Sequence, residues 1–352
     1  MPIDLTRVLD PALAGFDDII DVRSPSEFAE DHLPGAINLP VLDDDERARV
    51  GTIYKQVSPF AARKVGAALV AANAARHISG PLADRPGSWR GLIYCWRGGQ
   101  RSGSFATILA QIGWRVDVIR GGYKAWRRLV VERVQHDAIG APVVVLDGNT
   151  GSAKTAILQR MAGQGAQVID LEALARHRGS LFGAFADGQP GQKAFEGRLA
   201  SVLDRLDPKH PVIVEAEGSR IGKLNLPKAI WRAICDAPRI RLHVPIDIRA
   251  RYCARDYADL LSDPGLLHDR IIALSSLHPK ERIEQWLALV QAGQAEALAE
   301  GLMRHHYDPR YDRHRARFAT QRDADLDVAD LADLDGIAAW VNAKAKQLVS
   351  WP

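Results

Sequence analysis

An unbroken apolar run that leads into a glycine-rich loop constrains the fold of this chain more than any other feature. Residues 142–146 are all apolar and are followed by Asp147, so none of their side chains is suited to face water. Such a run indicates a strand buried on both faces, as in parallel sheets covered by helices. Residues 148–155 contain two glycines and end in Lys154 and Thr155, and apolar residues then recur with helical spacing. This order predicts an α/β fold.

The same alternation of strand and helix patterns extends over most of the chain. Short apolar runs predict further strands at residues 18–22, 92–94, 116–119, 167–170, 212–215 and 240–244. From about Lys280 onward the pattern is mainly helical. We therefore expect two α/β domains with parallel sheets, residues 1–134 and 135–280. A helical C-terminal extension, residues 281–352, is expected to pack on the second domain.

The composition excludes several classes of protein. Hydrophobic residues make up 47% and charged residues 25%, which is typical of a globular chain. Three cysteines cannot build a disulfide framework and fit a reducing compartment. No apolar run approaches the ~18 residues of a membrane-spanning helix, and the first residues lack a secretory signal pattern. We expect a cytoplasmic protein without a membrane partner.

A candidate anion-binding loop begins at Cys95, between the predicted strand at 92–94 and a helical pattern. Backbone N–H groups at the start of a helix bind anions, and arginines add charge and paired hydrogen bonds. The same field lowers the pKa of a cysteine below its free value of about 8.5 and favours the thiolate. The residues that we expect to bind the anion are Arg97, Gly98, Gly99, Gln100, Arg101 and Ser102.

The alternative for each cysteine is a buried and inert side chain. The glycine pair and the two arginines favour a reactive Cys95. Cys235 and Cys253 lack such surroundings, and we expect them to be inert. No metal-ligand spacing joins the three cysteines, so we expect no metal centre of zinc type.

The loop after residues 142–147 approximates the phosphate-binding pattern G-x-x-x-x-G-K-[ST] in its required strand–loop–helix context. In such loops the backbone N–H groups cradle phosphates, the lysine neutralises charge and the Ser/Thr hydroxyl binds Mg²⁺. Alanine replaces the second glycine, and we expect it to be compatible only with a negative φ. The alternative is an ordinary strand–turn–helix. The candidate phosphate-binding residues are Gly148, Asn149, Thr150, Gly151, Ser152, Ala153, Lys154 and Thr155.

Two carboxylates end the predicted strand at residues 212–215. Glu215 and Glu217 should point to the same side of an extended chain, where they can hold Mg²⁺ through water or act as a base. Arg220 follows, and two roles stay open for it: a contact to a phosphate or an ion pair with one of these glutamates.

The first half of the chain resembles the rhodanese domain. The resemblance rests on residues 21–28, residues 32–40 and residues 121–126, in this order. It implies a rhodanese-like α/β fold with Cys95 as the residue that handles sulfur or selenium. The loop from Cys95 through Arg101 is one residue longer than is usual in sulfurtransferases and resembles that of phosphatases on the same fold. The longer loop favours a phosphate-sized anion.

The three segments Cys-Trp-Arg-Gly-Gly-Gln-Arg-Ser, Gly-Asn-Thr-Gly-Ser-Ala-Lys-Thr and Glu-Ala-Glu-Gly-Ser-Arg-Ile-Gly occur in this order. Together they resemble the tRNA 2-selenouridine synthase family over nearly the whole length. Ala153 departs from the Gly-Lys-Thr of that family. The resemblance implies two reactions on a wobble 2-thiouridine of tRNA. Geranyl diphosphate first alkylates the sulfur, and selenium from selenophosphate then replaces the geranylthio group.

From this resemblance we expect selenophosphate at the Cys95 loop and geranyl diphosphate at the phosphate loop, with Mg²⁺ as an additional ion. It implies no haem, flavin or zinc. It also implies an anticodon loop of tRNA as a partner, together with an enzyme that supplies selenophosphate.

A basic and aromatic block near the C-terminus is the candidate tRNA surface, because arginines contact phosphates and aromatic rings stack on unpaired bases. The alternative is a solvated helix whose arginines pair with the aspartates at residues 323–335. The residues of the block are Arg304, Tyr307, Arg310, Tyr311, Arg313, Arg315 and Arg317.

Three competing functions explain less of the chain. A P-loop kinase of small molecules explains only the second half. A rhodanese-type sulfurtransferase or phosphatase explains only the first half. A pure interaction protein would leave both anion loops without a role.

Overall fold

The computed structural model describes residues 2–137, 139–180, 182–185, 187–316 and 323–349. The chain forms two compact units. The first unit consists of Met1–Asp137 and Pro190–Arg205, and the second unit consists of Ala138–Gln189 and Leu206–Pro352. No helix in the described part of the chain is long and apolar enough to cross a membrane.

The first unit is built on a five-stranded parallel sheet in the order β1-β5-β4-β2-β3. In that order the strands are Pro2–Ile3, Arg115–Ile119, Arg90–Tyr94, Asp18–Asp21 and Ala36–Asn38. Ile20 pairs with Ile93, which pairs in turn with Val118, so apolar side chains form the centre of the sheet. Ile20 and Ile93 are fully buried. The carboxyl end of the central strand β4 leads directly into Cys95.

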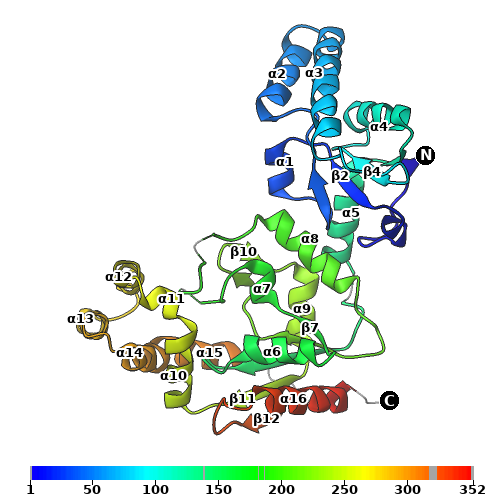
Figure 1. The fold of residues 1–352 in the computed structure, drawn as a ribbon. Coiled ribbons are helices and arrows are strands. Elements are labelled where there is room, and N and C mark those ends of the chain that lie inside the picture. Colours follow the sequence, from blue (N-terminus) through cyan, green and yellow to red (C-terminus); the bar gives the residue numbers. More distant parts are fainter. Residues whose placement is uncertain (1, 138, 181, 186, 317–322, 350–352) are drawn as a thin grey trace. The chain divides into compact units, whose positions relative to one another are not determined.

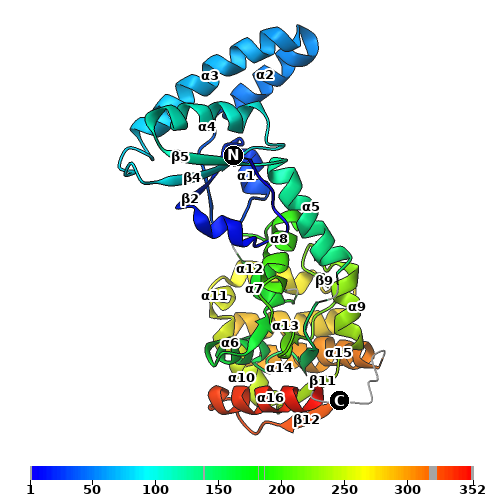
Figure 2. The same cartoon turned by 90° about the vertical axis from the view of Figure 1, so that its right-hand side faces the viewer.

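Helices cover this sheet. In chain order they are the 3₁₀ helix η1 (Pro11–Gly15), α1 (Pro25–Glu30), α2 (Asp44–Gln56), α3 (Pro59–Ser79), α4 (Gln100–Ile112), α5 (Gly122–Gln135) and α8 (Gln192–Leu203). The helices α2 and α3 lie side by side as a hairpin (Figures 1 and 2). Asp43 and Glu46 form a capping box at the start of α2, and Ser58 caps α3, so the sequence specifies where both helices begin.

The helix α8 belongs to the first unit although it follows the phosphate loop in the chain. Arg127 of α5 donates a hydrogen bond of 3.1 Å to the Lys193 carbonyl and forms an ion pair with Glu196. Gly197 leaves room for the ring of Trp126, since a Cβ at Gly197 would lie 3.0 Å from that ring. The units are therefore not the contiguous segments expected from the sequence, because packing partners in α8 and α5 are about seventy positions apart.

The second unit has another five-stranded parallel sheet, in the order β12-β11-β6-β8-β7. In that order the strands are Ala324–Asp327, Arg239–His243, Val143–Gly148, Val212–Glu215 and Gln167–Ile169. Two short strands, β9 (Arg220–Ile221) and β10 (Leu224–Asn225), form a separate antiparallel pair. The expected α/β fold is confirmed in both halves.

Among the described residues beyond position 280, one strand departs from the helical expectation. Residues Ala324–Asp327 form the edge strand β12, in which Ala324 pairs with Ile240 of β11. Ala324 is buried and Leu326 packs against the same apolar core. The strand is short and rich in aspartate, so its pattern does not predict a strand without knowledge of the neighbouring edge.

The helices of the second unit are α6 (Lys154–Gly163), α7 (Leu171–Ala175), α9 (Lys228–Asp236), α10 (Ile246–Asp256), α11 (Ala258–Leu261), α12 (Pro264–Ile272), α13 (Lys280–Gln291), α14 (Ala295–Leu302), the π-helix η2 (Met303–Tyr307), α15 (Asp308–Arg315) and α16 (Leu334–Val349). The helices α6 and α16 pack together in the apolar core over the sheet. Figure 1 shows α10 to α14 gathered on one side of this unit. The phosphate loop joins β6 to α6.

Candidate functional site

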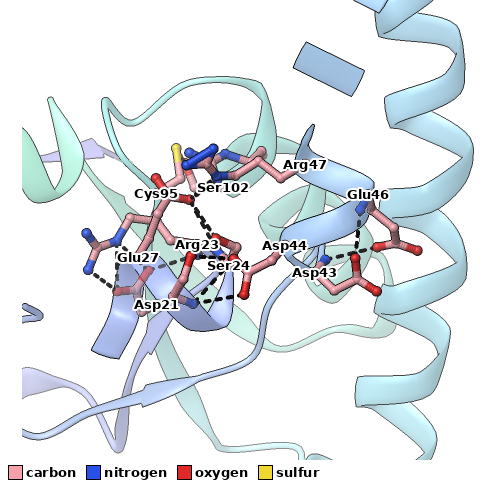
Figure 3. Close-up of polar contacts among 12 residues, drawn as sticks. Asp21, Arg23, Ser24, Glu27, Asp43, Asp44, Glu46, Arg47, Cys95 and Ser102 are labelled. Atoms are coloured by element: carbon pink, nitrogen blue, oxygen red, sulfur yellow. Dashed lines mark hydrogen bonds and ion pairs between the residues drawn. The ribbon is translucent and has the colours of Figure 1, made fainter. Parts of the chain in front are cut away.

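The Cys95 loop connects the end of β4 to the first turn of α4. The Cys95 sulfur accepts a hydrogen bond of 3.3 Å from the Gly99 N–H and one of 3.2 Å from the Ser102 hydroxyl. Only 3% of Cys95 is exposed. Figure 3 shows Cys95 with Ser102 beside it. The loop thus directs donors at the sulfur, as expected for a site that stabilises a thiolate.

These donors change the acidity of the thiol. Burial alone would raise the pKa of Cys95, but hydrogen bonds from the Ser102 hydroxyl and from the backbone of Ser102, Arg97 and Gly99 lower it below its usual value. Hydrogen bonds to the charged form favour ionisation. Cys95 is therefore a better nucleophile at neutral pH than an ordinary buried cysteine.

The glycine pair at residues 121–122 holds the Cys95 loop in place. The first turn of α5 donates hydrogen bonds from Tyr123 N–H to the Cys95 carbonyl at 2.9 Å and from Lys124 N–H to the Trp96 carbonyl at 3.0 Å. Gly122 has φ +57°, and a Cβ there would collide with the Cys95 carbonyl. The start of α5 thus fixes the position of the Cys95 loop through backbone contacts.

The charged groups around the Cys95 loop include one arginine that sequence reasoning missed. Arg101 binds the Glu27 carboxylate at 2.8 Å. Arg47 of α2, which Figure 3 labels together with Glu27, binds the same carboxylate at 3.2 Å. Burial would raise the pKa of Glu27, but these arginines lower it. Arg97 is exposed and Gln100 begins α4. Arg47 carried no local signal, because only the packing of α2 brings it to Glu27.

The phosphate loop holds its lysine over the loop backbone. Lys154 Nζ donates a hydrogen bond of 2.8 Å to the Gly148 carbonyl and lies 5.5 Å from the centre of the Tyr311 ring. Burial would lower the pKa of Lys154, but Tyr311, Glu217, Glu172 and Asp147 raise it, so the ammonium stays charged. A charged lysine above backbone N–H donors suits a di- or triphosphate.

The expectation of a negative φ at Ala153 is wrong. Its φ is +56° rather than negative, and it caps the N-terminus of α6 in the left-handed region. That region costs a residue with a Cβ about 1–2 kcal/mol relative to the right-handed one. Ala153 therefore has a backbone conformation that favours glycine, and the loop holds it there under strain.

The other loop residues contribute backbone and side-chain contacts. The Ser152 hydroxyl donates to the Asn149 carbonyl at 2.6 Å, and Arg249 donates to the Thr150 carbonyl at 3.1 Å. Gly151 has φ +83°, and a Cβ on it would lie 2.7 Å from the Arg249 carbonyl. The loop is therefore packed closely against α10.

Three glutamates meet beside the phosphate loop, and the sequence indicated only two of them. The Thr155 hydroxyl donates to Glu172 at 2.7 Å and to Glu215 at 3.4 Å, and the Glu172 N–H donates to Glu215 at 2.7 Å. Glu217 faces Glu172 across Gly179, where a Cβ would lie within 2.6 Å of both carboxylates. Glu172 was missed because it lies in α7, and the pairing of the preceding strand β7 with β8 brings it to Glu215.

Burial raises the pKa of all three carboxyl groups, and repulsion adds to it: Asp170 acts on Glu172, and Glu172 acts on Glu215 and Glu217. The pKa of Glu215 lies well above its usual range, that of Glu172 is raised, and that of Glu217 is raised to about 8. No group of three or more His, Cys, Asp or Glu side chains in the described residues is arranged to hold a metal by itself. Mg²⁺ commonly takes one or two carboxylates plus substrate phosphates, and the Thr155, Glu172 and Glu215 oxygens fit that requirement.

Of the two roles left open for Arg220, the ion pair with a glutamate is not formed, and the contact to a phosphate stays a prediction. It is exposed, and its Nε donates to the Gly222 carbonyl at 2.9 Å instead of pairing with a glutamate of the cluster. A different arginine lines the pocket of the phosphate loop: Arg178, which binds Asp259 at 3.1 Å and lies 4.8 Å from the Tyr257 ring centre. Arg178 is a further cation that the sequence did not single out.

Part of the expected tRNA-binding block folds back onto the phosphate loop. Arg315 binds the Asp147 carboxylate at 3.1 Å and the Asn149 side chain. Tyr311 lines the phosphate-loop pocket, and Tyr307 lines an apolar cavity next to it. These three side chains therefore belong to the surroundings of the phosphate loop and not to one exposed surface.

Three further members of that block are exposed. Arg304 forms an ion pair of 2.7 Å with Glu300, Arg313 donates to the Pro309 carbonyl at 3.0 Å, and Arg310 is exposed. Arg317 lies outside the described residues. The ion pairs of Arg304 and Arg315 join them to Glu300, Asp147 and Asp312. For these two arginines the alternative of a pairing with the aspartates at positions 323–335 gains no support.

The two other cysteines differ from Cys95 in their surroundings. Burial raises the pKa of Cys253 to about 12 and raises that of Cys235 as well. Cys253 lies at the boundary between the phosphate-loop pocket and the apolar cavity. Both thiols stay protonated at neutral pH.

Comparisons with known proteins match both halves of the chain. Residues 7–129 match the family model of the rhodanese-like domain, and residues 141–276 match that of the tRNA 2-selenouridine synthase AAA domain. A relative named tRNA 2-selenouridine synthase from Hahella chejuensis is 39% identical over 68% of this chain and 63% of its own length. Another from Chromohalobacter salexigens is 40% identical over 69% of this chain and 66% of its own length.

The match therefore spans slightly less than two thirds of these two relatives. A longer match joins the chain to a protein of the same name from Pseudomonas syringae pv. tomato. That protein is 33% identical over 86% of this chain and 90% of its own length. The match of residues 141–276 and the relatives of the same name show that the chain belongs to the tRNA 2-selenouridine synthase family.

Proposed function

We propose that this protein converts 2-thiouridine at the wobble position of tRNA into 2-selenouridine through an S-geranyl intermediate, with geranyl diphosphate and selenophosphate as co-substrates. One observation carries the proposal. The chain has two anion-binding loops with different reactive groups: a thiol of lowered pKa at Cys95, and a charged lysine beside three carboxyl groups at Lys154. Two successive reactions with two different phosphate-containing substrates require such a division.

The phosphate loop suits the first reaction. A bond forms between the thiouridine sulfur and C1 of the geranyl group, the C1–O bond breaks, and pyrophosphate leaves. Lys154 and the backbone N–H groups of residues 148–153 bind the charge that develops on pyrophosphate. Arg178 lines the same pocket. When bound by Thr155 and the neighbouring carboxylates, Mg²⁺ would neutralise further charge on the leaving group.

Alkylation of the sulfur releases the proton from N3 of the thiouridine. Glu217, the glutamate of this cluster that is not a proposed Mg²⁺ ligand, is the proton acceptor of this pocket. A general base works best when its pKa lies near the working pH, and the pKa of Glu217 is about 8.

The Cys95 loop suits the second reaction. Selenium in selenophosphate already has the oxidation state of selenide, so its transfer to a thiolate as a perselenide would need an oxidant. Attack of the Cys95 thiolate on phosphorus needs none: the S–P bond forms, the P–Se bond breaks, and hydrogen selenide is released. Selenide then displaces the geranylthio group from C2, and water hydrolyses the cysteinyl phosphate to phosphate and the free thiol.

The tRNA partner is proposed for the exposed part of the basic block. Arg304, Arg310 and Arg313 are exposed and can contact backbone phosphates. An enzyme that makes selenophosphate must supply the second co-substrate. With these two partners, the activity is proposed for the cytoplasm.

The test is nucleoside analysis of thiolated tRNA after incubation with the protein. With geranyl diphosphate alone we expect S-geranyl-2-thiouridine, and with both co-substrates 2-selenouridine. Selenation of thiolated tRNA at full rate without geranyl diphosphate would contradict the proposed order. ATP turnover without tRNA would support a kinase instead, and hydrolysis of an aryl phosphate without tRNA would support a phosphatase.

A further inference from the structure

A groove lies among the helices α2, α3 and α4 of the first unit, where α3 packs against both of the other helices (Figures 1 and 2). Its volume is about 590 Å³, which lies within the roughly 300–1,000 Å³ of ordinary ligand pockets. Its apolar lining includes Leu42, Val50, Tyr54, Ala62, Ala67 and Val70. The two loops described above leave this groove without a role.

One wall of the groove is the first turn of α4. Gln100 and Arg101 of this turn line the groove. The residue before them, Gly99, donates its N–H to the Cys95 sulfur at 3.3 Å. Leu42, on the apolar side of the groove, belongs to the same buried core as Cys95. A group held in the groove therefore lies against the helix turn that directs its donors at the reactive thiol.

Hydrogen bonds between α2 and α3 hold the walls of the groove. The buried Asn73 of α3 donates to the Glu46 carboxylate at 2.7 Å and to the Val41 carbonyl at 3.1 Å. A Cβ on Gly66 would lie 3.5 Å from Val50 Cγ1, so the two helices approach each other closely. A ligand therefore enters a space that is already ordered, which favours binding.

The buried and the exposed residues of the groove differ in character. Ala62 and Val70 are buried and form an apolar floor, whereas Tyr54 is 58% exposed. Arg63 is also exposed, and its Nε donates to the Pro59 carbonyl at 3.3 Å rather than to a carboxylate. An apolar floor with a cation and an aromatic ring at its edge suits a hydrocarbon chain that is attached to a nucleic acid.

We propose that this groove holds the geranyl chain of the S-geranylated tRNA nucleotide while selenium is introduced. The proposal rests on the proposed second reaction at the Cys95 loop and adds a site for its leaving group. In that reaction the C2–Se bond forms, the C2–S bond breaks, and the geranylthiolate leaves with the bonding electron pair. Burial of its chain favours geranylated tRNA over thiolated tRNA as the substrate of this step.

The test compares Ala67→Phe, which fills part of the groove, with Ala68→Phe on the same helix. Ala68 is exposed and does not line the groove. The substrates are tRNA with S-geranyl-2-thiouridine and tRNA with S-methyl-2-thiouridine, each incubated with selenophosphate. Both lose a thiolate from the same carbon, but only the first has a chain that can occupy the groove.

Wild type should selenate the S-geranyl tRNA with a kcat/KM roughly tenfold or more above that for the S-methyl tRNA. Ala67→Phe should lower kcat/KM for the S-geranyl tRNA by roughly tenfold or more and leave that for the S-methyl tRNA within about twofold of wild type. Ala68→Phe should change neither value. Thermal unfolding of both full-length variants confirms that they are folded. Equal rates of the two variants on the S-geranyl tRNA would overturn the groove assignment, and so would an equal loss with both substrates.

Binding without selenophosphate separates failure of the groove from failure of the proposed reaction. An anticodon stem-loop with S-geranyl-2-thiouridine should bind wild type roughly tenfold or more tightly than one with S-methyl-2-thiouridine, and Ala67→Phe should remove most of that difference. If binding follows this pattern but no selenium is transferred, the proposed reaction fails and the groove assignment stands. If wild type shows no difference, or Ala67→Phe keeps all of it, the groove assignment fails whatever the rate of selenation.

Discussion

The Cys95 loop and the phosphate loop use the same backbone arrangement for different chemistry. Each follows the carboxyl end of a buried parallel strand and ends in the first turn of a helix, where backbone N–H groups favour an anion. At Cys95 the donors act on a side chain and lower the pKa of the thiol. At Lys154 the reactive groups are a cation and three carboxyl groups with raised pKa values. The side chains around each loop, and not its backbone, therefore determine which reaction the loop can support.

The sharpest test of this division is Cys95→Ser. We expect selenation to fall on the order of a thousandfold or more, because the nucleophile is lost, while geranyl transfer stays at the wild-type rate. Nucleoside analysis of the two steps measures both rates. Cys235→Ser is the control, since that thiol has a raised pKa and lies outside both loops. Loss of geranylation with full selenation would reverse the assignment of the loops.

Lys154→Ala should give the opposite result. Geranyl transfer should fall by about a hundredfold or more, because the variant lacks the cation that binds the leaving pyrophosphate. Selenation of tRNA that already carries the S-geranyl group should be unchanged. Arg160→Ala on the same helix is the control, because Arg160 is exposed and pairs with the exposed Asp335. Unchanged geranyl transfer in Lys154→Ala would remove the phosphate loop from the first reaction.

Ser102→Ala tests what lowers the pKa of Cys95. Without the hydroxyl that donates to the sulfur, the thiol pKa should rise. The thiolate form dominates above the pKa, so the acid limb of the selenation rate should move to higher pH. We expect a loss on the order of tenfold at low pH and recovery at high pH. Ser104→Ala on the same helix is the control. A loss that is equal at every pH would show that Ser102 acts in another way.

Substitutions in the proposed tRNA surface should have smaller effects than those in the two loops. Arg310→Glu with Arg313→Glu should weaken tRNA binding and flatten its dependence on salt, by a slope change of about one for each phosphate that the variant no longer binds. Arg251→Glu is the control, because Arg251 is exposed on α10 and pairs with Asp247. Binding measured at several salt concentrations decides the outcome. An unchanged slope would exclude this part of the basic block from the interface.

The sequence predicted the parts of both sites that are local in the chain. The strand at residues 142–147 and the loop that follows it occupy the expected places, because an apolar run and a glycine pattern depend only on neighbouring residues. Arg47 and Glu172 were missed because other elements carry them to Glu27 and Thr155. Arg315 looked like a surface cation, yet α15 folds back and pairs it with Asp147. Contacts between distant segments depend on packing, which periodicity does not reveal.

The smallest expected effect concerns the strained residue of the phosphate loop. Ala153 has φ +56°, and the Cys95 loop places a glycine, Gly98, at its own left-handed position. Ala153→Gly removes a strain of about 1–2 kcal/mol but adds chain entropy to the unfolded state, so the net gain should be roughly 0.5–1 kcal/mol. Urea unfolding of the second unit in the full-length chain measures it.

Ala162→Gly, in the helix α6 that follows the phosphate loop, is the control. It should lower the free energy of unfolding, whereas Ala153→Gly should raise it. Ala162 lies in the last turn of α6 and is exposed, so glycine there should destabilise by up to about 1 kcal/mol. If Ala153→Gly destabilised the chain as Ala162→Gly does, the left-handed conformation of Ala153 would be wrong. If Ala153→Gly stabilised the unit without changing pyrophosphate affinity, the strain would belong to folding alone. A gain in both would show that the alanine also holds the loop back from its best fit to phosphate, a cost that the Cys95 loop avoids with Gly98.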